Sequence, residues 1–264
     1  MFSITTESSF SLASFILWIS WRLKFAELLS IDAEKSVSFN FGVSFSPIED
    51  LDVTMDYYNI SIDDVITLNT LQSMIDEERS SGNKNPNIVR DANDRIIEAT
   101  AGLQNLGTLD TSGIDLKLGY RYDFNYATVR YDFMGSYVLD FSQPEYVGGP
   151  VNNQVGRNGM PEYRFNTGVG LSFLEDHDIY LSADHIADQA QDVDDDYKKI
   201  GHISSQTTWN IAYDYLAPWD AKFTAGVRNL TDEDPAFEAD GVTYDEELYS
   251  IQGRVYFLKY SQNF

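Results

Sequence analysis

Polar and apolar residues alternate one by one along much of the chain from residue 36 onward. In the stretch 36–46, Val37, Phe39, Phe41, Val43 and Phe45 alternate with serine, asparagine and glycine. Because neighbouring side chains of a β-strand point to opposite faces, this pattern predicts a strand with one apolar and one small, polar face. The same reasoning predicts eight further strands, over 51–62, 114–124, 127–141, 163–173, 179–185, 209–215, 219–227 and 251–264.

The predicted connections alternate in length. Short ones fall at 47–50, at Asn125, at 175–178 and at 217–218, and long polar ones at 63–110, 142–160, 187–205 and 230–249. Several strands exceed ten residues, and a tilted strand needs about 9–11 residues to cross a bilayer. Short turns on one side and long loops on the other are typical of bacterial outer-membrane barrels. We therefore predict an all-β fold, an antiparallel up-and-down transmembrane β-barrel, with one short helix over 68–79 in the first long extracellular loop.

Aromatic side chains gather beside the short turns. Phe124, Phe173 and Trp219 lie there, and nine alternating strands return the last residue, Phe264, to the same side. Rings at this level of a barrel form a girdle at the membrane interface. We therefore predict a periplasmic aromatic girdle that includes these four residues.

Composition narrows the function classes. The chain has 264 residues, a net charge of −24 and no cysteine, which argues against a nucleic-acid partner and excludes disulfides. A mean hydropathy of −0.31 is compatible with alternating barrel strands. The stretch 10–19 is apolar like the core of a signal peptide, but the basic residues Arg22 and Lys24 follow it, which is the wrong polarity for export.

Four stretches together resemble a known family. They are AGVRNLTDEDP at 225–235, the Gly253-Arg254 pair before the aromatic last strand, AEKSVSFNFGVSF at 33–45 and NLGTLDTSGIDL at 105–116. In this order and spacing they are similar to the C-terminal part of a TonB-dependent outer-membrane receptor. The resemblance covers roughly residues 30–264.

The resemblance implies a 22-stranded barrel filled by an N-terminal plug, with a TonB box that contacts the energy-transducing TonB complex. Such receptors take up siderophores, vitamins, haem or saccharides. About nine strands, an odd number and an open sheet edge indicate a partial barrel. We therefore expect residues 31–264 to be the C-terminal barrel portion and leave residues 1–30 unassigned, with a misread start of a truncated gene as the hypothesis.

Several partners follow from this resemblance. We expect the outer membrane of a Gram-negative bacterium as location, its lipid and a small-molecule nutrient as partners, and the barrel assembly machinery as a partner of the last strand. The TonB complex is expected only for a full-length receptor. The chain alone is expected not to transport.

Candidate binding residues lie in the loops and on the polar strand faces. We expect ligand contacts from Tyr146, Asn152 and Asn153, together with Arg157 of the same long connection. The adjacent strands 114–124 and 127–141 carry two arginines on their polar faces, Arg121 and Arg130. In a complete receptor these two would face the lumen or the plug.

Catalysis is not predicted. His177 is expected in a turn, and His185 follows Asp184 directly, so their side chains point to opposite faces of a strand and cannot form a relay. The acidic run 192–196 lacks the glycine and distal glutamate of an EF-hand, which favours a solvated loop over a calcium site. We expect no enzyme activity, no cofactor and no metal.

Two alternatives remain open at this point. One is a small outer-membrane barrel that acts as an enzyme or adhesin, which would need inward-facing histidine and acidic groups on neighbouring strands, or a barrel that closes by itself. The other is a soluble β-sandwich with a carbohydrate-binding face, which would bury the aromatic residues in a core instead of placing them at one end.

Overall fold

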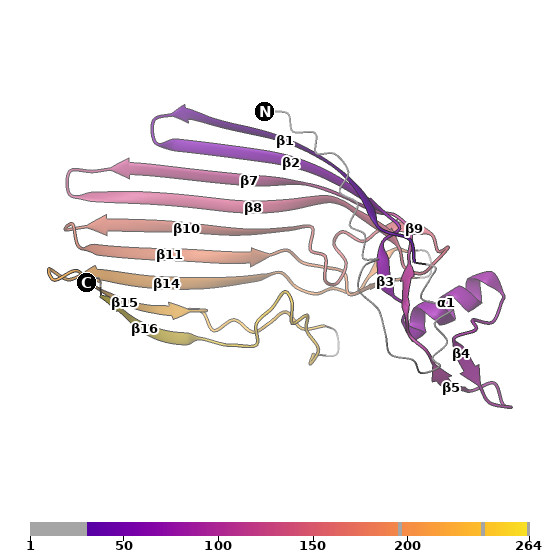
Figure 1. The fold of residues 1–264 in the computed structure, drawn as a ribbon. Coiled ribbons are helices and arrows are strands. Elements are labelled where there is room, and N and C mark those ends of the chain that lie inside the picture. Colours follow the sequence, from indigo (N-terminus) through magenta and orange to yellow (C-terminus); the bar gives the residue numbers. More distant parts are fainter. Residues whose placement is uncertain (1–30, 195–196, 239–240, 263–264) are drawn as a thin grey trace, which may run out of the picture. The chain divides into compact units, whose positions relative to one another are not determined.

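The computed structural model describes residues 31–194, 197–238 and 241–262. Nine long strands form one antiparallel sheet in which each strand pairs with its sequence neighbours (Figure 1). In order they are β1 (Lys35–Ile48), β2 (Leu51–Asp63), β7 (Leu109–Asp123), β8 (Ala127–Pro144), β10 (Tyr163–Phe173), β11 (His177–Ile186), β14 (Gln206–Leu216), β15 (Ala221–Arg228) and β16 (Val255–Gln262). A short strand, β9 (Val151–Asn153), pairs with β8. The prediction of nine up-and-down strands is therefore confirmed.

Some strand ends differ from the prediction. The β7 strand begins at Leu109 instead of 114 and continues through Gly113, where the Tyr58 hydroxyl occupies the place of the missing Cβ. Pro47 lies inside β1, which an edge strand tolerates because a proline there breaks no ladder bond. His177 is the first residue of β11 and not part of the turn, which corrects its predicted place.

The long first connection folds into local elements. These are β3 (Ile66–Leu68), which pairs with β6 (Leu103–Asn105), the helix α1 (Leu71–Ser81), and a hairpin of β4 (Ile88–Arg90) and β5 (Ile96–Ala99). The helix begins three residues later than predicted because Thr70 caps it, accepting a hydrogen bond from the Ser73 backbone N–H. It ends at Gly82, whose φ of 70° is the left-handed C-cap conformation.

The chain divides into two compact units. One comprises residues up to Phe39, Asn59–Ser112 and Asp140–Gln154, and holds α1 with its hairpins and β9. The other comprises Asn40–Tyr58, Gly113–Leu139 and Val155–Phe264. It holds most of the sheet and a two-stranded pair of β12 (Asp192–Val193) and β13 (Lys199–Ile200). We refer to them as the loop unit and the sheet unit.

The register of the sheet unit separates two faces. Odd-numbered residues of β10, β11 and β14 face one another, as in the row Val169, Leu181 and Ile211. This apolar face is widely exposed: Leu258 on β16 is 87 % and Tyr256 is 71 % exposed. A soluble sandwich would bury such a surface under a second layer. The sheets that the described residues form besides this one have only two strands each.

The order of strands starts at β1 and stops at β16. Within the described ranges, each of these two strands pairs on one side only, so the sheet has two open edges. In the same part of the chain, none of the helices has the length and apolar character needed to cross a membrane.

Candidate functional site

The polar face of the sheet unit carries linked ionic hydrogen bonds. Arg130 on β8 donates through Nη1 to the Ser172 hydroxyl on β10 at 2.6 Å and through Nη2 to the Asp178 carboxylate on β11, also at 2.6 Å. Ser172 in turn donates to Asp178 at 2.5 Å. Charge-assisted bonds of this kind are stronger than neutral ones, so this network fixes three strands at their turn-proximal ends.

A second network lies nearer the long loops. The carboxylate of Asp184 on β11 accepts one hydrogen bond from Asn166 on β10 at 2.7 Å and another from Asn210 on β14 at 2.9 Å. Tyr180, also on β11, donates to Asp132 on β8 at 2.8 Å. The polar face therefore carries side-chain hydrogen bonds between strands both near the turns and near the long loops.

A pocket of about 320 Å³ opens on this surface at its loop end. Asp184 and Asn210 form part of its wall, and Arg228 lies in the same lining on β15, the strand next to β14. The Arg228 guanidinium lies 5.4 Å from the centre of the Phe257 ring, within the range of a cation–π contact. In the part of the chain that the structure describes, this guanidinium makes no hydrogen bond or ion pair. It is held in place and available to an anionic or hydroxyl-rich group.

Hydrogen bonds within the chain hold the pocket wall in place. The side-chain amide of Asn229 donates to the backbone carbonyl of Glu233 and accepts from the Glu233 backbone N–H, both at 2.8 Å. The backbone N–H of Asn229 donates to the side-chain oxygen of Asn210 at 3.1 Å. Gln206 donates to the Asp234 backbone carbonyl at 2.7 Å. Rigid polar groups of this kind bind with little loss of conformational entropy.

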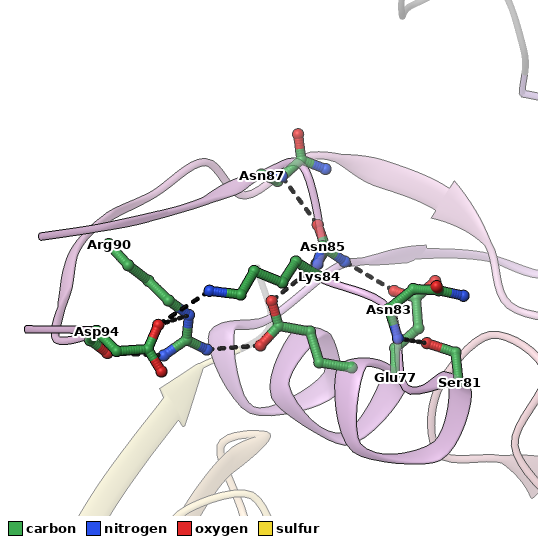
Figure 2. Close-up of polar contacts among 9 residues, drawn as sticks. Glu77, Ser81, Asn83, Lys84, Asn85, Asn87, Arg90 and Asp94 are labelled. Carbon is green, nitrogen blue, oxygen red and sulfur yellow. Dashed lines mark hydrogen bonds and ion pairs between the residues drawn. The ribbon is translucent and has the colours of Figure 1, made fainter. Parts of the chain in front are cut away.

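The loop unit holds a second ionic cluster, drawn in Figure 2, between α1 and the β4–β5 hairpin. Arg90 pairs with Glu78 at 2.5 Å, and Lys84 pairs with Asp94 at 3.0 Å. Glu78 also accepts from the Asn85 backbone N–H at 2.8 Å. That bond, followed by the Arg90 contact, lowers the pKa of Glu78, and Lys84 lowers the pKa of Asp94. Both carboxylates therefore help to hold the loop when ionised.

The predicted ligand residues do not share one unit. Tyr146, Asn152 and Asn153 belong to the loop unit, the two asparagines lying on β9 opposite Gln143 and Ser142. Arg157 belongs to the sheet unit, where its backbone bridges to Met160 and Ala190. Ligand binding by these four residues stays a prediction.

The two predicted lumen arginines both lie on the polar face. Arg130 is in the network described above, and Arg121 pairs with Asp123 at 3.1 Å at the end of β7. Thr128 of β8 donates to Asp123 at 2.5 Å, which places this pair on the same face as Arg130. A role in plug contact stays a prediction.

The predicted girdle residues lie at the short turns. Phe124 contacts Tyr122 with ring centres 4.7 Å apart, Phe173 contacts His177 at 5.2 Å, and Trp219 lies in the turn between β14 and β15. Phe264 lies outside the described residues. The register adds further rings to this row, which runs through Phe173, His177, Tyr215, Phe223 and Tyr260.

A second aromatic row, which the sequence reasoning missed, lies at the loop end of the same apolar face. The distances between ring centres are 6.4 Å from Tyr137 to Tyr163, 5.8 Å from Tyr163 to His185 and 4.7 Å from His185 to Phe165. These residues come from β8, β10 and β11, so only their register brings them together. The sequence signal for this row was that these strands also carry aromatic residues toward their long-loop ends, away from the short turns.

The histidine geometry agrees with the sequence argument against a relay. Asp184 bonds asparagines on the polar face, whereas His185 stacks on Tyr163 and Phe165 on the apolar face. His202 lies 3.9 Å from Asp188 at an exposed position. Of the predicted acidic run, Asp195 and Asp196 lie outside the described residues.

A comparison with protein families identifies the fold of the chain. The family model described as "TonB dependent receptor-like, beta-barrel" matches residues 25–230. No curated protein matches the chain in sequence.

Three solved structures show the same fold. The siderophore receptor PirA from Acinetobacter baumannii is 16 % identical with a TM-score of 0.57, over 87 % of this chain and 32 % of that one. A ferric enterobactin receptor variant from Pseudomonas aeruginosa, in complex with enterobactin, is 16 % identical with a TM-score of 0.60, over 87 % and 31 %. The FrpB iron transporter from Neisseria meningitidis is 12 % identical with a TM-score of 0.54, over 88 % and 31 %. The chain thus spans about a third of the length of these structures.

Proposed function

Because the chain belongs to the TonB-dependent receptor β-barrel family, we propose that it forms part of the wall of an outer-membrane receptor for a small-molecule nutrient. The nine strands of residues 31–264 are the C-terminal portion of that wall. The neighbouring structures are receptors and transporters, which supports a transport role over an enzymatic one.

The single observation that carries the proposal is the spacing of the two aromatic rows. On β10, Phe173 of the turn row and Tyr163 of the loop row are ten residues apart. At roughly 3.3 Å per residue and a strand tilt of roughly 45°, this is a height of about 23 Å. The apolar band of an outer-membrane barrel is about 25 Å tall between its aromatic girdles. The exposed apolar face between the rows then contacts lipid.

The polar face then lines the lumen. Its pocket beside Arg228 and the loop residues Tyr146, Asn152, Asn153 and Arg157 are the proposed nutrient contacts. Arg121 and Arg130 are the proposed plug contacts in a complete receptor. Siderophores are the favoured ligand class because two of the neighbouring structures are a siderophore receptor and a ferric enterobactin receptor, and a guanidinium held on an aromatic ring suits an anionic ligand.

Transport requires strands in addition to these nine. The edges of β1 and β16 carry backbone groups that no described strand pairs with, so in lipid they must pair with further strands, either of a complete receptor or of a second copy of the chain. We propose that the TonB complex acts only on a receptor that has its plug, and that β16 is the strand that the barrel assembly machinery engages.

The test is whether the chain is found in the outer membrane or in the soluble fraction. Expressed with an export signal in a Gram-negative host, the full chain should fractionate with the outer membrane. In detergent electrophoresis it should migrate differently before and after heating, because a folded sheet resists detergent until heated. A chain that purifies as a soluble monomer without detergent contradicts the proposal.

A further inference from the structure

The two edge strands of the nine-stranded sheet run in the same direction. β1 ends at the short turn 49–50, so it runs from the side of the long loops to the side of the short turns. Each following strand of the up-and-down order reverses the direction, and β16, the ninth strand, therefore runs the same way as β1. A partner that pairs with both edges has to accept two strands of equal direction.

The β1 edge lacks the features that protect a free sheet edge. Natural sheets shield such edges with charged side chains, prolines or bulges. Between Ser36 and Ser46, β1 carries neither a charged side chain nor a proline, and all 14 residues of the strand are exposed. A long, uncharged strand of this kind is a template for pairing with a further strand.

The β16 edge is open as well. Leu258 on β16 is 87 % exposed, whereas Leu181 on the same face of β11, which has a paired strand on each side, is 37 % exposed. The difference reflects the missing neighbour on one side of β16. The polar face of β16 carries the large side chains of Phe257 and Lys259, and the polar face of β1 carries only serine, asparagine and glycine up to residue 46. Large side chains on one edge and small ones on the other can lie side by side.

The direction of the edges decides how a second copy of the chain fits. If β16 of each copy pairs with β1 of the other, a two-fold axis along the membrane normal relates the copies, and the ring closes. Both copies then have their long loops on one side of the membrane and their apolar faces toward lipid. Antiparallel pairing of β1 with β1 would instead put the acidic loops of the two copies on opposite sides of the membrane.

We propose that two copies of this chain close one barrel through two identical parallel seams between β1 and β16. This inference rests on the proposed function, because lipid is what requires both edges to be paired. Twice nine strands gives eighteen, a number within the range of outer-membrane barrels. A parallel seam is slightly less stable per residue than an antiparallel one, but it leaves no open edge in lipid.

The first test is the number of chains in the folded species. The full chain, expressed with an export signal, is extracted from the outer membrane in detergent without heating, and its protein mass is measured by sedimentation. The mass should be that of two chains of 30.0 kDa each. A folded species that contains one chain, or one chain together with a different polypeptide, overturns the proposal.

Cross-linking tests the seam itself. The chain has no cysteine, so one copy can carry Ser44→Cys on β1 while a second, differently tagged copy carries Ser261→Cys on β16. Both positions lie toward the short turns and on the polar face, since Ser44 contacts Thr54 of β2 and Ser261 lies opposite Lys222 of β15. A short bismaleimide should join the two tags in the intact membrane.

Val255→Cys is the matched control for the direction of the seam. It lies on the same face of β16 as Ser261, six residues toward the long loops, or about 20 Å away. A bismaleimide shorter than this distance should not join Val255→Cys to Ser44→Cys. Cross-linking of that pair in place of the Ser261 pair would show an antiparallel contact, and cross-linking between two copies of Ser44→Cys would show pairing of β1 with β1. Either result overturns the proposal.

These outcomes are separable from the proposed function. A chain that enters the outer membrane but folds as a single copy contradicts the two-copy barrel alone. A chain that purifies as a soluble monomer without detergent contradicts the proposed function and the two-copy barrel together.

Discussion

Arg130 on β8 and Asp178 on β11 form an ion pair at 2.6 Å although β10 runs between their strands. Ser172 of β10 fills the gap, since it accepts a hydrogen bond from Arg130 and donates one to Asp178. One guanidinium thus connects three consecutive strands on the polar face. Such a contact depends on register, and a slip of one residue would move each of these side chains to the other face.

Replacing Arg130 by methionine should destabilise the folded sheet by about 1 kcal/mol, because the Asp178 carboxylate keeps only its serine partner and the pair is partly exposed. The measurement is the urea midpoint of the full chain in detergent, followed by tryptophan fluorescence. Arg164→Met is the matched control on the same face, since its guanidinium has no partner among the described residues. An equal shift in both variants would show that the network adds nothing.

Trp209 and Trp219 should sit at opposite interfaces of the membrane. Trp209 lies on β14 opposite Ala183, near the loop row, and Trp219 lies in a short turn. In variants that retain a single tryptophan, lipids brominated near the headgroup should quench either residue more than lipids brominated at the chain end. Equal quenching at all depths would speak against the two girdles.

The ionic cluster of the loop unit should weaken in acid. The pKa of Glu78 is held below its ordinary value of 4.5, first by the Asn85 backbone N–H and then by Arg90. A lowered folded pKa means that the stabilisation is fully present above about pH 4.5 and is lost as the pH falls through the folded pKa. Hydrogen exchange of the α1 amides should therefore accelerate below that pH.

A variant locates the cause of this acid sensitivity. Arg90→Met should raise the pH at which α1 exchange accelerates, because Glu78 then keeps only its backbone donor. The control is Arg79→Met, whose ion pair with Asp76 joins a side chain that is 75 % exposed. If the two variants shift the exchange profile alike, the Glu78 contact is not the cause.

The sequence predicted the strands where alternation was complete and failed where a single contact decided the outcome. Residues 163–173 alternate with one exception, Thr167, and β10 has these bounds. The start of β7 was missed because residues 110–113 are all polar or glycine and show no alternation, whereas Gly113 makes room for Tyr58 within the strand. The start of α1 was missed because an apolar residue, Leu68, precedes the Thr70 cap and belongs to β3.

Features that depend on register or on distant loops could not be predicted. The row of Tyr137, Tyr163 and His185 needs the pairing of three strands, and the contact of Gln189 with Tyr249 joins residues 60 positions apart. The turn girdle was predictable because each short turn is local in sequence. The four loop residues from Tyr146 to Arg157 rest on composition alone, which does not fix a ligand.

We propose that one face of the sheet meets lipid and the other meets water. The chain has no cysteine, so each introduced thiol is unique. Leu181 and Ser182 are neighbours on β11, midway between the aromatic rows, and point to the apolar and polar faces respectively. The variants Leu181→Cys and Ser182→Cys form a matched pair.

The decisive measurement is labelling of these two thiols by a charged maleimide in the intact outer membrane. Ser182→Cys should react, whereas Leu181→Cys should react only after the membrane is dissolved and the chain is heated, because a charged reagent does not enter lipid. Equal reaction of both thiols in the intact membrane, or reaction of Leu181→Cys alone, would contradict the account.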